Sequence, residues 1–222
     1  MRRFFLLISI FCLPLYAAAN ETGFATAAPH VVMMDYETGL VLFEKDARTA
    51  IAPASMTKIM TAELVFDRLR DGTLTKDTEF TVSREAWRRG GAASGSSTMF
   101  LEAGSKVRVE DLLRGVIIQS GNDACITLAE GIAGSETAFA DLMTQHARDI
   151  GLESATFRNA TGWPHPEHRI SLYDLAKLGQ RTIRDYPEFY SLYSEAEYTW
   201  NGITQTNRNP LLGRFTGADG LK

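Results

Sequence analysis

The feature that most restricts the fold is a single β-hairpin pattern followed by a long run of helical patterns. His30 to Ala47 holds two apolar runs around Glu37-Thr38-Gly39, and Gly39 can supply the positive φ that a tight turn needs. Two strands cannot by themselves make a sheet that covers a core. The sequence therefore predicts a mixed α/β protein, and we expect the natural protein to continue past Lys222, where further strands would complete the sheet.

Helices are predicted wherever apolar residues recur at three- and four-residue steps. The first is an amphipathic helix from about Ser55 to Arg70, and residues 83–97, rich in Gly, Ser and Ala, are predicted to form one long loop. Further helices are expected within residues 106–119, 122–134, 135–150 and 171–185. This order indicates an initial α/β unit followed by a mostly helical subdomain over roughly 83–195.

The first 19 residues have the pattern of a secretory signal peptide. Arg2 and Arg3 precede an apolar run, and three alanines at 17–19 form a small-residue cleavage site. The apolar run is short for a membrane span. We therefore expect export to the periplasm with cleavage near Ala19, which leaves residues 20–222 as the mature part of the chain.

Composition narrows the class of function. The net charge is -4 and no basic stripe is visible, so nothing indicates binding to nucleic acid. Cys12 leaves with the signal peptide, which makes Cys125 the only cysteine of the mature chain and excludes an internal disulfide. Cys125 lies in an apolar helical run and is expected to be a buried small hydrophobe, with a reactive thiol as the alternative.

The stretch PASMTKIMTAEL, Pro53 to Leu64, places Ser55 and Lys58 three residues apart at the start of the first predicted helix. Residues i and i+3 share a helix face, so the serine oxygen and the lysine amine can approach each other. The positive end of the helix dipole favours an oxyanion there, and a desolvated lysine can act as a base near neutral pH. Ser55 is thus a candidate nucleophile, or simply a helix N-cap.

Two later stretches carry chemistry that fits this pair. QSGNDA places Ser120 and Asn122 at a turn between two predicted helices, where the serine could relay a proton and the asparagine could contact substrate and lysine. The alternative is a plain helix–helix turn capped by Asn122 or Asp123. Lys222 would begin a strand, from which its amine could bind a carboxylate as a point charge.

In order and spacing, these three pieces resemble the S-x-x-K, Ser-x-Asn and K-T-G motifs of penicillin-binding proteins and class A β-lactamases. The resemblance is more specific to the low-molecular-weight D-alanyl-D-alanine carboxypeptidases of the peptidase S11 type, and it lies in PASMTKIMTA, GSSTMFLEAG, LLRGVIIQSGNDA, ATFRNATGW, NRNPLL and DGLK. It covers nearly the whole mature chain, with the third motif cut after its lysine. Residues 20–222 are therefore identified as the N-terminal part of such a catalytic domain.

The resemblance implies a β-lactamase-like fold, with an antiparallel sheet flanked by helices, a mostly helical subdomain and the active site between them. It implies that Ser55 attacks the carbonyl of the penultimate D-alanine in a peptidoglycan stem peptide and that Lys58 takes its proton. Ser120 would pass that proton to the departing D-alanine, Asn122 would orient the substrate, and Lys222 would hold the terminal carboxylate. No metal or cofactor is implied, and β-lactam antibiotics are expected to acylate Ser55.

Several alternatives stay open within this class. The Ser-Gly-Asn turn, in place of Ser-Asp-Asn, favours a carboxypeptidase over a class A β-lactamase. The same residues would serve a D,D-endopeptidase that cuts crosslinks, and a non-catalytic penicillin-binding scaffold is the rival outside the enzymes. We expect the isolated 222-residue chain to be inactive without the closing strands, and association with the outer face of the inner membrane would depend on a further C-terminal region.

His165 and His168 form an H-x-x-H pattern that could hold a metal ion. Pro164 and Pro166 flank the first histidine and favour an irregular surface loop instead, so no metal site is predicted. His146 is expected to be solvated on a polar helix face.

Overall fold

The computed structural model describes residues 24–222, so the predicted signal peptide over residues 1–19 lies outside the described residues. The helices of the described range are α1 (Thr57–Arg70), α2 (Arg84–Gly90), α3 (Val109–Ile117), α4 (Asn122–Ala133), α5 (Glu136–Asp149), α6 (Leu172–Asp185) and α7 (Pro187–Tyr190). Its strands are β1 (Val31–Met34), β2 (Val41–Lys45), β3 (Ala50–Ile51), β4 (Glu79–Thr81), β5 (Lys106–Arg108), β6 (Ile170–Ser171), β7 (Glu197–Trp200) and β8 (Ile203–Thr206). The strands pair antiparallel as β1–β2, β3–β6, β4–β5 and β7–β8, and the prediction of a mixed α/β protein is confirmed.

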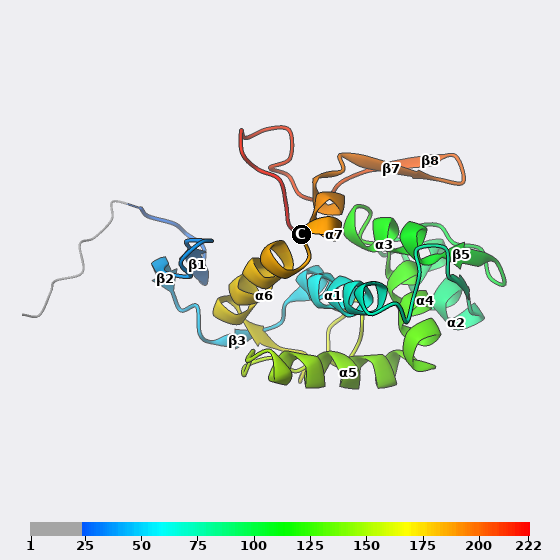
Figure 1. Ribbon diagram of the computed structural model, residues 1–222, viewed down its shortest axis with the longest axis horizontal. Coiled ribbons are helices and arrows are strands. Elements are labelled where there is room, and N and C mark those ends of the chain that lie inside the picture. The colour runs from blue at the N-terminus through cyan, green and yellow to red at the C-terminus, as the bar shows by residue number, and fades with distance from the viewer. Residues whose placement is uncertain (1–23) are drawn as a thin grey trace, which may run out of the picture.

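The predicted hairpin is present as β1 and β2. Gly39 has a φ of +72°, and the Asp35 N–H donates to the Leu40 carbonyl over 2.8 Å to close the turn. The Gln180 amide of α6 donates to the Tyr36 carbonyl over 2.5 Å, which ties the hairpin to that helix. β1 and β2 therefore lie on α6, at one end of the molecule (Figure 1).

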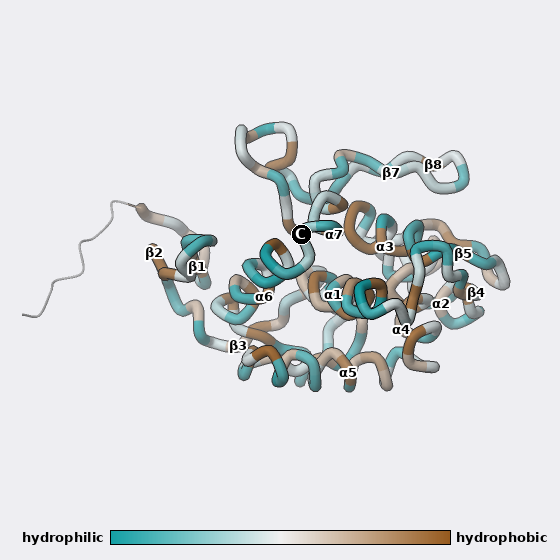
Figure 2. The backbone as a smooth tube through the Cα atoms, in the orientation of Figure 1, coloured by the Kyte–Doolittle hydropathy of each residue, from teal (hydrophilic) through white to brown (hydrophobic). Residues whose placement is uncertain are grey.

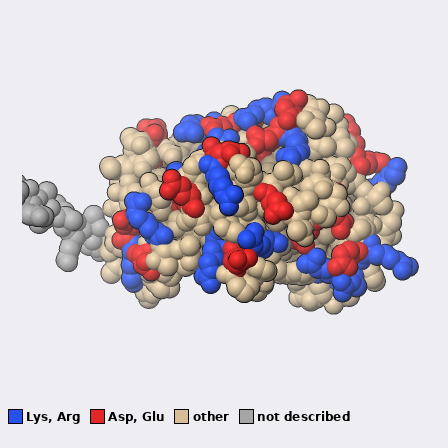
Figure 3. All heavy atoms as spheres, turned by 90° about the horizontal axis from the view of Figure 1, so that it is seen from below, with Lys and Arg blue, Asp and Glu red and all other residues tan. Residues whose placement is uncertain are grey.

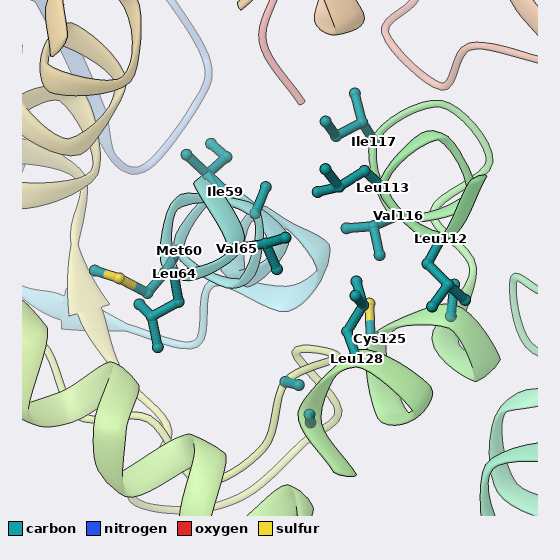
Figure 4. Packing of buried hydrophobic residues seen from close by; sticks show 14 of the residues in the cluster. Ile59, Met60, Leu64, Val65, Leu112, Leu113, Val116, Ile117, Cys125 and Leu128 are labelled. Atoms are coloured by element: carbon teal, nitrogen blue, oxygen red, sulfur yellow. The ribbon is translucent and has the colours of Figure 1, made fainter. Parts of the chain in front are cut away.

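Helix α1 occupies the centre of the molecule, between α6, α5, α3 and α4 (Figure 1). Its first ten residues, Thr57 to Phe66, are all buried. In Figure 4, Val65 points toward Leu113 and Val116 of α3, while Met60 and Leu64 point to another side of the same helix. The prediction of an amphipathic helix is therefore wrong for this part of α1, because tertiary packing covers every face.

The outer helices keep one buried face. In α6 the buried residues Asp174, Leu175, Leu178, Gly179 and Thr182 follow the helical repeat, and Figure 2 shows polar and apolar residues alternating along α5 and α6. Acidic and basic side chains are interspersed on the face shown in Figure 3, as expected from a sequence without a basic stripe. Among residues 24–222, no helix has the length and apolar character needed to cross a bilayer.

The prediction of one long loop over residues 83–97 is wrong. Its first half forms α2, which Ser83 caps by accepting a hydrogen bond from the Ala86 N–H over 2.9 Å. Gly90 ends this helix against α4, where a Cβ atom would lie 2.2 Å from the backbone nitrogen of Asp123. The glycine is thus required for the close approach of α2 to the turn that carries the second motif.

The sequence reasoning missed the hairpin β7–β8. Its turn is Asn201-Gly202, with both residues at positive φ, and this dipeptide is a strong local signal for such a turn. The hairpin is fixed to the turns that carry the candidate motifs, because Gln119 donates to the Tyr198 carbonyl over 3.1 Å and Gln205 donates to the Thr98 carbonyl over 2.9 Å. The hairpin therefore lies beside α3 and supports the segments that carry Gln119 and Thr98 (Figure 1).

Candidate active site

Ser55 lies in a short 3-10 turn, Ala54–Met56, that leads into α1. The alternative that it caps the helix is wrong, since α1 begins at Thr57 with Met56 in the N-cap position and without a side-chain capping bond. Ala54 holds a positive φ of 48°, which a non-glycine residue rarely adopts. The exposed Ser55 therefore lies in a strained turn, and such strain is common at functional sites.

Lys58 lies one turn further along α1 and is almost completely buried, with 1% of its surface exposed. Its amine lies 3.4 Å from Ser55 Oγ and donates to Asn122 Oδ1 over 2.8 Å and to the Thr161 carbonyl over 2.6 Å. Burial lowers the pKa of this amine, although nearby acidic groups oppose the shift. A lysine held this way gives up its proton more readily than one in water, so it is suited to act as a base on Ser55.

The QSGNDA turn brings the side chain of Asn122 to the same amine. Asn122 accepts from Lys58 and donates to Ser96 Oγ over 3.0 Å, so it is held from both sides. Ser120 is buried and has a positive φ of 60°. The turn is more than a helix–helix connection, because its Asn122 side chain contacts the Lys58 amine and its Ser120 holds a strained backbone conformation.

The carboxylate of Asp123 holds this turn in place, a role that the sequence does not predict. Its buried carboxylate accepts hydrogen bonds from the Thr98 hydroxyl over 2.7 Å and from the N–H groups of Met99, Leu101 and Ala124 over 2.8, 3.0 and 2.9 Å. The sequence pattern predicts only a possible cap of α4 at this position. The carboxylate instead holds the segment that follows Ser96 against the start of that helix.

Lys222 reaches the site from the last described residues, and no strand is present over residues 207–222. Its amine donates to the carbonyls of Val116 and Ile117, over 3.1 and 2.7 Å, at the C-terminal end of α3. Burial lowers its pKa to about 7, and the positive charge of Lys58 adds to the effect. The structure therefore brings Lys222 close enough to Lys58 for their charges to interact.

A loop of the ATFRNATGW stretch completes the surroundings of Lys58. Asn159 Oδ1 accepts hydrogen bonds from the N–H groups of Thr161, Gly162 and Trp163. These bonds fix the turn so that the Thr161 carbonyl points toward the Lys58 amine. Gly162 has a φ of +86°, and a Cβ atom there would lie 1.9 Å from the Ala54 carbonyl oxygen. The sequence does not predict the contact of this stretch with Lys58, although an asparagine three residues before a glycine indicates a turn.

The two histidines of the H-x-x-H pattern do not converge. His165 is exposed, whereas His168 is buried and contacts the first turn of α1. His168 Nδ1 accepts from the Arg158 N–H over 3.1 Å, so its ring proton is on Nε2, which donates to the Thr57 hydroxyl over 2.8 Å. No cluster of metal-ligating side chains is found among residues 24–222.

The buried position of His168 predicts a pH-dependent contribution to stability. Burial lowers the pKa of His168 to about 4, so the unfolded chain takes up this proton near pH 6.5 while the folded chain takes it up only near pH 4. The contribution of His168 to the free energy of unfolding should therefore be constant above pH 6.5 and fall by about 3 kcal/mol as the pH drops to 4. Denaturant unfolding of wild type and His168→Gln across this range should show the smaller loss in the variant, and equal slopes would contradict the assignment.

His146, predicted to be solvated, lies instead against α1. Its Nε2 is 3.1 Å from the buried carboxylate of Glu63, which also receives the Arg181 guanidinium over 2.7 Å. The carboxylate is fully buried and paired on both sides, so this cluster joins α5 and α6 to the central helix.

The fold is that of the penicillin-binding D,D-peptidases, which have a β-lactamase-like fold. A family model described as D-alanyl-D-alanine carboxypeptidase, peptidase S11, matches residues 17–222. The chain belongs to this family, and the predicted fold and family are confirmed. The predicted roles of Ser55, Lys58, Ser120, Asn122 and Lys222 stay predictions.

Three comparisons illustrate the likeness. The D-alanyl-D-alanine carboxypeptidase DacC of Escherichia coli is 44% identical over 216 residues, which are 94% of this chain and 53% of DacC. The crystal structure of DacD from Francisella tularensis aligns with a TM-score of 0.85 at 32% identity, over 98% of this chain and 62% of that one. Penicillin-binding protein D2 of Listeria monocytogenes in its ampicillin-bound form aligns with a TM-score of 0.76 at 26% identity, over 88% and 78%. The chain thus spans between half and two thirds of the carboxypeptidases named here.

Proposed function

We propose that this chain carries the nucleophile and base of a serine-type D-Ala-D-Ala carboxypeptidase that removes the terminal D-alanine from peptidoglycan stem peptides. The observation that carries the proposal is the exposed Ser55 hydroxyl 3.4 Å from a buried lysine amine. The relatives named as D-alanyl-D-alanine carboxypeptidases support the reaction class, and the ampicillin-bound relative supports inhibition by β-lactams.

The first half of the reaction forms an acyl-enzyme. Neutral Lys58 takes the hydroxyl proton while Ser55 Oγ bonds to the carbonyl carbon of the penultimate D-alanine. The Ser55 N–H stabilises the oxyanion of the tetrahedral intermediate. When the carbon–nitrogen bond breaks, the departing amine receives the proton held by Lys58, relayed by the Ser120 hydroxyl, and D-alanine leaves.

The second half restores the enzyme. Water attacks the ester carbonyl, Lys58 takes its proton, and Ser55 leaves as the hydroxyl once the ester bond breaks. Asn122 stays bonded to the lysine amine and keeps it directed at the reacting oxygen. Lys222, held at the C-terminal end of α3, would bind the terminal carboxylate of the substrate through its protonated amine.

The signal-peptide pattern supports a periplasmic location, where peptidoglycan is found. A D,D-endopeptidase would use the same residues and differ only in the room around the cleft. The proposal keeps the carboxypeptidase because the sequence relatives named above carry that name.

The test is release of D-alanine from a pentapeptide ending in D-Ala-D-Ala by the complete gene product. We expect release that prior treatment with benzylpenicillin blocks, together with a penicilloyl adduct that peptide mass spectrometry places on Ser55. A crosslinked stem-peptide dimer is offered in parallel. Cleavage of the dimer without D-alanine release would replace the carboxypeptidase by an endopeptidase, and an adduct without either reaction would replace it by a binding protein.

A further inference from the structure

A carboxylate outside the known motifs supports the loop that contacts Lys58. Glu136 is the first residue of α5, and its side chain is 10% exposed. Its Oε1 accepts from the Ala160 N–H over 3.1 Å, and the carbonyl of the following residue, Thr161, accepts from the Lys58 amine over 2.6 Å. The Ala160 carbonyl is held in turn by the Thr61 hydroxyl over 2.8 Å. Glu136 is therefore connected to the Lys58 amine through the backbone of Ala160 and Thr161.

Arg89 of α2 partly neutralises this carboxylate. One guanidinium nitrogen lies 2.9 Å from Glu136 Oε2, and the guanidinium also lies over the Trp163 ring, 5.2 Å from its centroid. Trp163 belongs to the same loop, so the arginine contacts both the carboxylate and the loop that the carboxylate supports. Glu136 and Arg89 therefore form an ion pair beside the loop that contacts Lys58, and the Arg89 side chain is partly exposed to solvent.

We propose that Glu136 and Arg89 are positioning residues that set the basicity of Lys58, Glu136 by holding the Thr161 carbonyl in place and adding negative charge, and Arg89 by offsetting that charge. This inference deepens the proposed function, because it rests on Lys58 being the base. Neither residue touches the substrate or the reacting atoms, and both act through the lysine.

Other charged and titratable groups also face Lys58. Asp123 and Cys125 approach it from α4, Glu136 from α5 and Lys222 from the last described residues. The Asp123 carboxylate is committed to four hydrogen bonds, and burial raises the pKa of Cys125 to about 11, which keeps the thiol neutral at pH 7. Glu136 differs from Asp123 because its charge is matched by a separate cation that can be removed by substitution.

The test compares two variants for which opposite effects are expected. The rate constant for acylation by a fluorescent penicillin is measured from pH 5 to pH 10, where the rate rises as Lys58 loses its proton. Glu136→Gln removes negative charge and should move the midpoint of this rise to lower pH by about 0.5–1 unit. Arg89→Gln leaves Glu136 unneutralised and should move it to higher pH by a similar amount. Arg88→Gln is the matched control, since Arg88 pairs with Glu85 on the same helix, and it should leave the midpoint unchanged.

Shifts in the same direction, or a loss of rate without any shift, would overturn the proposal and leave the pair a purely structural role. A titration of the Lys58 side chain by NMR, with ¹³C in its ε position and Ser55→Ala as background, gives the same comparison without turnover. Opposite shifts there, with no acylation of the wild type, would retain the inference and reject the proposed function. Acylation of the wild type without opposite shifts would retain the proposed function and reject the inference.

Discussion

Replacing Ser55 with alanine should abolish both D-alanine release and the covalent penicillin adduct. The hydroxyl is the only group of that turn that lies beside the buried amine, at 3.4 Å, so no other atom of the turn can take its place. Loss of a nucleophile that acts together with its base lowers the rate by about 10⁴-fold or more. The fold should be kept, because Ser55 is exposed and makes no capping bond to α1.

The measurement combines a D-alanine assay with intact-mass detection of the adduct, on the complete gene product. Ser194→Ala is a suitable control, since it removes an exposed hydroxyl that bonds only to the nearby Ser191 carbonyl. An adduct that still forms on the Ser55→Ala protein would contradict the assignment. Ser120 would then be the first hydroxyl to examine, because it lies in the turn that contacts the same lysine through Asn122.

Replacing Asp123 with alanine should destabilise the protein by about 3–5 kcal/mol, the effect of breaking a buried charged network. Four donors lose their acceptor at once, and three of them are backbone N–H groups that are buried away from water. The loss should also lower acylation, because the segment that Asp123 holds leads from Ser96, the partner of Asn122.

Denaturant unfolding monitored by circular dichroism provides the check. Asp141→Ala on the exposed face of α5 is the matched control and should change stability by less than about 0.5 kcal/mol. Asp123→Asn should fall between the two, because an amide oxygen can serve only part of the donor set. A change for Asp123→Ala no larger than the control would show that the turn holds without the carboxylate.

The candidate site divides into a part that the sequence predicts and a part that it does not. Ser55 and Lys58 lie three residues apart on one helical turn, so local geometry alone brings them together. Thr161 is more than one hundred residues from Lys58, and nothing in its own neighbourhood indicates that its carbonyl meets an amine. Glu136 is hidden in the same way, since it occupies the first turn of a helix, where an acidic residue has an ordinary explanation.

The fold divides similarly. Helices α5 and α6 appear where the apolar repeat predicts them, because each keeps one exposed face. Helix α4 also lies where a helix is predicted, although its residues Asn122 to Ala129 are all buried. Residues 84–90 form a helix where a loop is predicted, because Ser83 caps its start before the glycines at 90 and 91 end it. In α1 the polar residues Thr61 and Glu63 are buried and satisfied by partners far along the chain, so no repeat in the sequence could show that the helix is central.

The central position of α1 has a consequence for motion. Its first ten residues are enclosed, so the helix has no face on which it could separate from the rest. The amide hydrogens around Lys58 should therefore exchange with water only when the whole domain unfolds, whereas those of the β1–β2 hairpin can exchange through local opening. Lys58, the proposed base, therefore belongs to the part of the molecule that should exchange most slowly.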